Sequence, residues 1–247
     1  MIKDPQARIT RIESWKDYHL FSLRIPAVAS EALPGQFVMV RVADQLDPLL
    51  RRPFSIHSKT PDGIEIFFQR TGTGTSLLSQ KKTDETLDII GPLGKGFTIS
   101  EDLRGKDVAV VGGGRGIAPL YFLAQRLRHL GAFVKIFYGG KSIQDLPLKE
   151  KFEEAGFELF CSTDDGSFGF KGLVSDFFSA ELARTRPSFL FSCGPELMME
   201  KIAHLAQSKN IPAEFSLEAN MGCGIGACWG CVRKIKREKE KIWLKIC

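Results

Sequence analysis

One stretch decides the fold: residues 107–131, with the sequence DVAVVGGGRGIAPLYFLAQRLRHLG. Its first half is a continuous apolar run that ends in glycines, as expected of a strand buried on both faces. Its second half predicts a helix that stops at Gly131. One face of this helix would be formed by Leu120, Leu123, Leu127 and Leu130. A buried strand followed by such a helix is the repeating unit of a parallel α/β sheet.

The same pattern recurs towards the C-terminus. Further strand-like runs are AFVKIFYGG, FELFCST and SFLFSCG, and helical candidates such as ELMMEKIAHLAQ alternate with them. Alternation of this kind predicts a doubly wound parallel sheet over residues 100–215.

Upstream of this region the pattern is that of an antiparallel β structure. Short runs of partly alternating apolar and polar residues are separated by Pro, Gly and Asp. They are RITRIESW, HLFSLRIP, QFVMVRVA, RPFSIHSK, GIEIFFQR and TLDIIGPLG. Six strands in under a hundred residues favour a closed barrel, since closure removes exposed sheet edges. We therefore expect a six-stranded antiparallel β-barrel over residues 1–99.

Downstream, residues 216–247 are rich in glycine and cysteine, and we expect them to form a small third domain built around a loop. The segment MGCGIGACWGC, residues 221–231, holds Cys223, Cys228 and Cys231, and Cys247 is the last residue of the sequence. This C-x4-C-x2-C…C spacing is typical of plant-type 2Fe–2S proteins, whereas structural zinc sites usually show paired C-x2-C motifs. The intervening glycines would let main-chain N–H groups approach the sulfurs. Zinc and unliganded thiols remain the alternatives, and KIKREKEK is expected to form a solvated turn between short strands.

Composition sets limits on the function and on the location of the protein. The chain has 247 residues, 43% of them hydrophobic, with a formal net charge of +5. Its basic residues are scattered, which does not favour nucleic-acid binding. It has no apolar run long enough for a membrane span, and its first residues lack a signal-peptide core. A cytoplasmic location is expected, where disulfides rarely persist. Six cysteines then point to metal binding, redox chemistry or burial, and burial is preferred for Cys161.

Two motifs of the expected barrel have the chemistry of a flavin site. RRPFSIHS, residues 51–58, resembles the R-x-[YF]-S pattern of the flavin-reductase superfamily. Its Arg52 could bind a pyrophosphate with both arms of the guanidinium, and Ser55 could hydrogen-bond the flavin. In RTGTGTSLLS, residues 70–79, Gly72 and Gly74 permit a tight turn that could cradle an anion, with N–H and hydroxyl donors from Thr75. A solvated arginine and an ordinary helix-capping loop are the alternatives.

The glycines after two buried strands indicate a nucleotide site. VVGGGRGIAPL, residues 110–120, departs from the G-x-G-x-x-G fingerprint, but its glycines lie between a strand and a helix, where a phosphate fits. SCGPELMM, residues 192–199, repeats this arrangement. Together the two motifs resemble the NAD(P)-binding domain of ferredoxin–NADP reductase-like proteins. That resemblance implies that NAD contacts Gly112, Gly113, Gly114, Gly116, Cys193, Gly194 and Pro195. A plain buried thiol is the alternative for Cys193, and Asp164 and Asp165 could bind a ribose or form a turn.

Over essentially its whole length the chain resembles the electron-transfer subunits of heteromeric, NAD-linked dihydroorotate dehydrogenases. The resemblance implies a cytoplasmic oxidoreductase subunit of pyrimidine biosynthesis with FAD, a 2Fe–2S cluster and NAD. Electrons would arrive from an FMN-containing catalytic partner subunit, with a heterotetramer as the expected assembly. The implied FAD contacts are Arg52, Pro53, Phe54, Ser55, Phe67, Phe68, Gln69, Gly74 and Thr75, and the implied iron ligands are Cys223, Cys228, Cys231 and Cys247.

The flavin would supply the chemistry, and no side chain is identified as a catalytic acid, base or nucleophile. Ser55 and Cys193 are expected near the reacting rings. Three alternatives remain. The chain could be the γ subunit of a hydrogenase or sulfide-reducing complex, a zinc-clipped binding or regulatory module without redox activity, or a self-sufficient flavin reductase.

Overall fold

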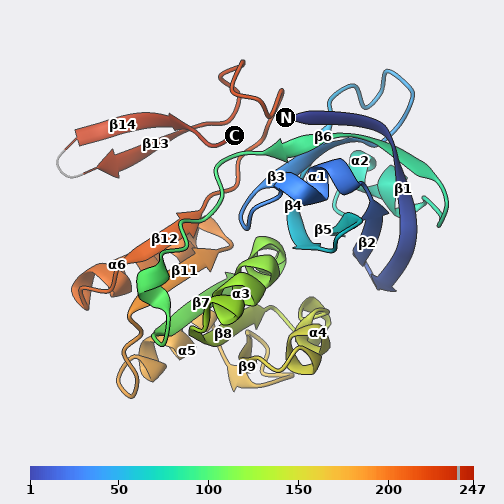
Figure 1. The fold of residues 1–247 in the computed structure, drawn as a ribbon. Coiled ribbons are helices and arrows are strands. Elements are labelled where there is room, and N and C mark those ends of the chain that lie inside the picture. The colour runs from blue at the N-terminus through green and yellow to red at the C-terminus, as the bar shows by residue number, and fades with distance from the viewer. Residues whose placement is uncertain (238–239) are drawn as a thin grey trace. The chain divides into compact units, whose positions relative to one another are not determined.

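The computed structural model describes residues 1–237 and 240–247, which form two compact units (Figure 1). The first unit combines residues 1–96 with residues 217–247, and the second consists of residues 97–216. The cysteine-rich segment therefore packs in the same unit as the N-terminal residues. That it behaves as a separate third domain stays a prediction.

The N-terminal part of the first unit is a closed barrel, as predicted. Its strands follow the order β1-β2-β5-β4-β3-β6, and every neighbouring pair is antiparallel. The strands are β1 (Ile2–Trp15), β2 (Tyr18–Arg24), β3 (Phe37–Arg41), β4 (Arg52–Lys59), β5 (Gly63–Gln69) and β6 (Thr86–Leu93). Alternating side chains fill the barrel, among them the fully buried Ile9, Phe21, Ile56, Ile66 and Ile89.

Two short helices connect barrel strands: α1 (Pro26–Glu31), which follows β2, and α2 (Thr73–Ser79), which follows β5. Leu78 of α2 and Val28 of α1 are fully buried, so each helix contributes to the packed interior. Burial of such a side chain is worth about 1.5–3 kcal/mol.

The second unit is a parallel sheet with the order β10-β9-β8-β7-β11-β12. Its strands are β7 (Asp107–Gly113), β8 (Phe133–Gly140), β9 (Glu158–Thr163), β10 (Phe170–Lys171), β11 (Phe189–Cys193) and β12 (Ala213–Ser216). The chain adds strands on one side of β7 first and then on the other, so the order reverses between β7 and β11. This is the doubly wound arrangement predicted from the sequence.

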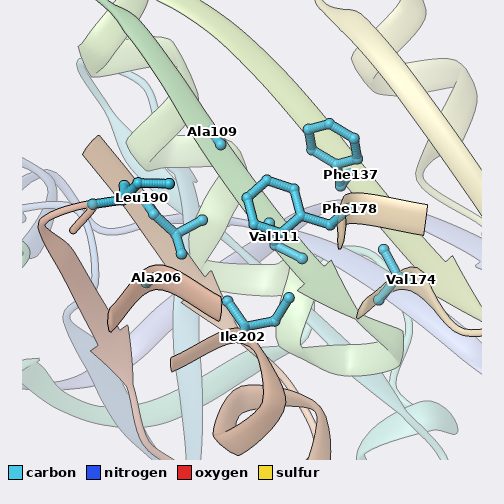
Figure 2. Packing of buried hydrophobic residues seen from close by; sticks show 9 residues of the cluster. Ala109, Val111, Phe137, Val174, Phe178, Leu190, Ile202 and Ala206 are labelled. Atoms are coloured by element: carbon cyan, nitrogen blue, oxygen red, sulfur yellow. The ribbon is translucent and has the colours of Figure 1, made fainter. Parts of the chain in front are cut away.

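Helices cover both faces of this sheet. They are α3 (Ala118–Leu130), α4 (Lys149–Glu154), α5 (Val174–Glu181) and α6 (Glu196–Ser208), with single 3-10 turns at Glu101–Leu103, Gly114–Ile117 and Ile143–Asp145. Two adjacent residues of β8 mark the two faces. Phe137 lies 5.0 Å from Phe178 of α5, whereas Tyr138 lies 6.5 Å from Phe152 of α4 (ring centroids). Figure 2 shows the first face, where Val111 and Leu190 of the sheet meet Ile202 and Ala206 of α6.

The cysteine-rich segment ends in a two-stranded antiparallel hairpin of β13 (Val232–Arg237) and β14 (Glu240–Lys245). The strands on both sides of the predicted turn in KIKREKEK are thus present, and residues 238–239 of the turn lie outside the described residues. Among the helices that the structure describes, none has the length and hydropathy needed to cross a membrane.

Candidate functional site

The cysteine loop, residues 221–231, is fastened to the barrel by side chains of β3. Phe37 and Met39 form a buried apolar cluster with Leu93, and Met221 and Cys247 pack against it. The loop approaches β3 so closely that a Cβ at Gly224 would lie 2.6 Å from Cγ of Met39. Gly224 also has a φ of +69°, so glycine is required here for two reasons.

The four predicted ligands lie in two contacting pairs, Cys223 with Cys228 inside the loop and Cys231 of the loop with Cys247. The N–H of Cys228 donates to Sγ of Cys223 over 3.3 Å, and Sγ of Cys231 lies 3.1 Å from Sγ of Cys247. Within the described residues, no three His, Cys, Asp or Glu side chains are gathered around one point where a metal ion would fit. Two pairs of soft thiolate donors match a centre with two irons, in which four cysteines hold the cluster.

Main-chain N–H groups of the loop point at the sulfurs. Ile225 donates to Sγ of Cys223 over 3.5 Å, and Gly226 donates to Sγ of Cys247 over 3.2 Å. The N–H groups of Cys228 and Ile225 lower the pKa of the Cys223 thiol to about 6. Since the thiolate is the form that binds metal, the backbone prepares this ligand for an iron–sulfur cluster. The donor set therefore fits the group that the spacing predicted.

The arginine of the predicted flavin motif is held at the start of β4. Nη1 of Arg52 donates to the carbonyl oxygen of Leu50 over 2.5 Å. Its guanidinium lies against Gly74 of α2, where a Cβ would come within 2.8 Å of Nε. The two predicted FAD motifs thus meet through Arg52 and Gly74. A positively charged fork that rests on a glycine without a Cβ can approach an anion such as a pyrophosphate, so these residues fit FAD.

The neighbouring Arg51 has a structural task that the sequence did not reveal. It donates to Asp88 of β6 twice, from Nη1 to the main-chain oxygen over 2.7 Å and from Nη2 to Oδ2 over 2.6 Å. Both side chains are only 19% exposed. This pair ties the residue before Arg52 to β6, which is separated from β4 by β3 alone in the barrel. The Arg-Arg doublet was the available signal, but its partner lies 37 positions away.

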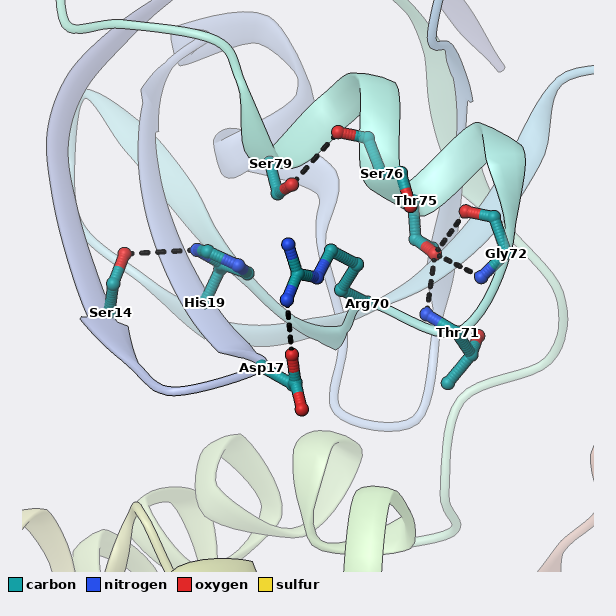
Figure 3. Close-up of polar contacts among 9 residues, drawn as sticks. All are labelled: Ser14, Asp17, His19, Arg70, Thr71, Gly72, Thr75, Ser76 and Ser79. Atoms are coloured by element: carbon teal, nitrogen blue, oxygen red, sulfur yellow. Dashed lines mark hydrogen bonds and ion pairs between the residues drawn. The ribbon is translucent and has the colours of Figure 1, made fainter.

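The loop after β5 is organised by hydrogen bonds of its own (Figure 3). Oγ1 of Thr75 accepts the N–H groups of Thr71 and Gly72 and donates to the carbonyl oxygen of Gly72. The Thr75 hydroxyl is therefore engaged within the loop. Before the loop, Nη2 of Arg70 donates to Oδ1 of Asp17 over 2.6 Å.

The remaining predicted FAD residues lie on β4 and β5. Pro53, Ser55 and Gln69 are half-buried. The rings of Phe54, Phe67 and Phe68 are buried, with 7%, 3% and 3% of their surfaces exposed. Little of these three rings is open to a ligand, because Phe54 packs on Phe68 and Phe67 stacks on Tyr18. Their contact with FAD stays a prediction.

In the second unit, the two glycine motifs meet where the strand order reverses. Cys193 at the end of β11 is the register partner of Gly112 in β7. A Cβ at Gly116 would lie 2.4 Å from both the carbonyl oxygen of Cys193 and Cα of Gly194. A Cβ at Gly113 would lie 3.0 Å from Cδ of Pro195. Ligands of open α/β sheets bind at this reversal point, so the glycine-lined edge fits a dinucleotide.

Other candidates have structural explanations. Asp165 accepts the N–H of Ser167 over 2.9 Å, which favours a turn at this position. Burial raises the pKa of the Cys161 thiol to about 12, as expected of an inert buried cysteine. Cys193 is 1% exposed. A role beside the nicotinamide stays a prediction for Cys193.

Comparison with known proteins gives one result for both units. Residues 218–247 match the model of the iron–sulfur cluster binding domain of dihydroorotate dehydrogenase B, and residues 110–204 match the oxidoreductase NAD-binding domain. The electron transfer subunit of dihydroorotate dehydrogenase B (NAD(+)) from Desulforamulus reducens is 41% identical over 217 residues, which cover 87% of this chain and 82% of that protein. The subunit of the same name from Shouchella clausii is 36% identical over 251 residues. This match covers 100% of this chain and 95% of that protein.

Solved structures show the same relationship at the level of the fold. A chain of the NADH-dependent reduced ferredoxin–NADP oxidoreductase, described for flavin-based electron bifurcation, superposes with a TM-score of 0.81 and 30% identity. The match covers 93% of this chain and 82% of that one.

Proposed function

Because this chain belongs to the family of the electron transfer subunits of dihydroorotate dehydrogenase B, we propose that it carries electrons between a catalytic partner subunit and NAD. In the complete reaction dihydroorotate would lose two electrons and two protons to become orotate. NAD would accept both electrons and one of the protons as a hydride, and the second proton would enter solvent.

One observation carries the proposal: the cysteine loop and the flavin motif meet on neighbouring barrel strands. Met221 of the loop and Cys247 pack against the apolar cluster that contains Phe37 of β3, and Phe37 is the register partner of Ser55 in β4. Residues paired in this way have Cα atoms about 4.5–5.5 Å apart. A cluster on the loop would therefore sit close to a flavin on β4, as electron transfer between the two requires.

Each part of the chain has a defined task in this scheme. When bound, FAD exchanges hydride with the nicotinamide and single electrons with the 2Fe–2S cluster. The four cysteines hold the cluster, and the loop amides offset its negative charge. Arg52 binds the FAD pyrophosphate beside Gly74, and the glycines at the reversal point of the parallel sheet receive NAD.

The partner, the assembly and the location form the finer part of the proposal. We infer a catalytic partner that contains FMN, a heterotetramer of the two subunits, a role in pyrimidine biosynthesis and a cytoplasmic location. The names of the relatives support the partner's reaction. Co-expression with a candidate catalytic subunit, followed by mass measurement of the complex, tests the assembly, and cell fractionation tests the location.

The first experiment is anaerobic purification followed by iron and FAD assays and by electron paramagnetic resonance after dithionite reduction. About one FAD and two irons per chain are expected, with the signal of a reduced 2Fe–2S cluster. A colourless protein that contains zinc would contradict the proposal.

A variant then tests the route of the electrons. The substitution C231S should remove the cluster and leave FAD in place. Reduction of ferricyanide by NADH should continue, because it needs only FAD, whereas NAD reduction by dihydroorotate with the partner should stop. C161S is the matched control, since Cys161 is a buried thiol of the second unit. If C231S keeps the coupled reaction, the cluster is not on the route.

A further inference from the structure

Lys245, the last residue of β14, reaches back to the cysteine loop. Its Nζ donates to the carbonyl oxygen of Gly226 over 2.7 Å. The same Nζ lies 4.6 Å from the centroid of the Trp229 ring. A loop carbonyl and an aromatic face thus hold the ammonium group between the hairpin and the loop. The negative face of the aromatic ring attracts the cation and helps to keep it in this position.

Gly226, the residue that Lys245 contacts, lies among N–H groups that face two ligand cysteines. Its own N–H donates to Sγ of Cys247 over 3.2 Å. On either side of it, the N–H groups of Ile225 and Cys228 donate to Sγ of Cys223 over 3.5 Å and 3.3 Å. Gly226 has a φ of +79°, which a glycine adopts without strain. Successive amides in such a turn form a concave site for an anion.

The hydrogen bond from Lys245 acts on this turn directly. The ammonium group is bound to the carbonyl oxygen in the middle of the turn whose N–H groups face Cys223 and Cys247. Its positive charge therefore adds to the favourable field that these N–H groups provide for a negatively charged cluster. It also keeps Gly226 in the orientation in which its own N–H faces Cys247.

We propose that Lys245, supported by Trp229, is a positioning residue that raises the reduction potential of the 2Fe–2S cluster. The inference rests on the proposed function, since it requires the cluster. Reduction adds one negative charge to the cluster, and nearby positive charge and N–H donors stabilise the reduced form. Lys245 supplies the charge and fixes the donors, so its loss makes the cluster harder to reduce.

The chain contains a matched control on the neighbouring strand. Nζ of Lys234 lies 5.5 Å from the ring centroid of Trp243, and the two residues are register partners in β13 and β14. Like Lys245 and Trp229, this pair consists of a lysine and a tryptophan, but both of its residues belong to the hairpin and neither belongs to the cysteine loop. K234M therefore removes the same charge from the same hairpin without removing the contact to Gly226.

The test is a redox titration of the full-length protein with its FAD and cluster, with the reduced cluster followed by electron paramagnetic resonance. K245M should lower the equilibrium constant for reduction about threefold to tenfold, where tenfold corresponds to ~59 mV for a one-electron couple. K245R, which keeps the charge and a donor, should restore the potential. K234M should leave it unchanged.

Iron content, measured for every variant, separates the possible results. If the unchanged protein has no 2Fe–2S signal, the proposed function itself fails. If K245M has two irons and an unchanged potential, or if K234M shifts it equally, the role of Lys245 is overturned. If K245M does not retain iron, the K245Q variant is titrated in its place. K245Q can still donate to Gly226 without the charge, and it should shift the potential in the same direction, whereas an unchanged potential would overturn the inference.

Discussion

A methyl group on Gly74 would lie 2.8 Å from Nε of Arg52, so the arginine of the flavin motif rests on the first turn of α2. The three nearest atoms all belong to the flexible arginine side chain. An added methyl group would therefore displace the guanidinium before it disturbed the backbone.

This contact predicts opposite effects of G74A on stability and on FAD binding. Alanine in place of glycine inside a helix stabilises it by up to about 1 kcal/mol. FAD affinity should fall about tenfold or more, because a displaced guanidinium loses charge-assisted hydrogen bonds of about 1.5–3 kcal/mol. Flavin fluorescence titration of the apoprotein measures the affinity, and urea unfolding measures the stability.

The neighbouring Gly72 provides the control for G74A. It has an extended φ of -170°, and a Cβ there would meet no atom within 4 Å. G72A should therefore bind FAD like the unchanged protein. Equal losses of affinity in the two variants would mean that Arg52 is not the residue affected.

The pair of Arg51 and Asp88 should contribute more to stability than the surface ion pairs of the same barrel. Both side chains are largely shielded from water, and Arg51 also holds the Asp88 carbonyl. We expect D88N to lower the free energy of unfolding by about 1–3 kcal/mol. The control is D84N, since Asp84 and Arg8 are 77% and 59% exposed and 3.7 Å apart. Such a pair is worth about 0–1 kcal/mol. Urea unfolding of both apoproteins decides the point, and equal effects would refute the expectation.

Much of the fold could be predicted because its signals are local. Alternation with turn residues marks the barrel strands, and the apolar run before the glycines of residues 110–120 marks the buried strand β7. The cysteine spacing likewise identifies the loop without any knowledge of packing. The family resemblance added the order of the cofactors.

The supporting contacts could not be predicted because they depend on tertiary register. Arg51 meets Asp88 only when β4 and β6 occupy the same barrel wall. Met39 meets Gly224 only when the loop returns to β3. Lys245 carried no signal beyond its position two residues before Cys247. The burial of Phe67 and Phe68 could not be predicted either, because the alternation of apolar and polar residues does not distinguish a face that binds a cofactor from the interior of the barrel.

The glycine-lined contact between β7 and β11 predicts a separable effect on NAD. A methyl group on Gly116 would lie 2.4 Å from backbone atoms at Cys193 and Gly194, which cannot move cheaply. G116A should therefore raise the KM for NADH by at least about tenfold, since small displacements near a reacting centre cost up to about a hundredfold. FAD content should stay unchanged, because the flavin residues belong to the other unit. Reduction of ferricyanide by NADH measures this KM.

Gly105 gives the comparison for G116A, since it lies in the same unit but outside the glycine motif. A Cβ there would meet nothing within 4 Å, although its φ of +68° makes alanine cost about 1 kcal/mol. G105A should change the KM for NADH much less than G116A. An equal effect of G105A would mean that the contact of Gly116 with Cys193 and Gly194 is not what the KM depends on.

Cys161 should give the protein a specific sensitivity to alkaline pH. Its folded-state pKa of about 12 lies above the ordinary thiol value of 9.0, because burial disfavours the thiolate. Below pH 9 the thiol is protonated in both states, so its contribution is fully present. Between pH 9 and 12 the unfolded chain loses this proton and the folded chain keeps it, so stability falls by up to ~1.4 kcal/mol per pH unit. Urea unfolding of C161A beside the unchanged protein isolates this effect. The difference between the two should be constant below pH 9 and should shift in favour of C161A above it. A difference that stays constant up to pH 11 would show that the Cys161 thiolate is tolerated in the folded state.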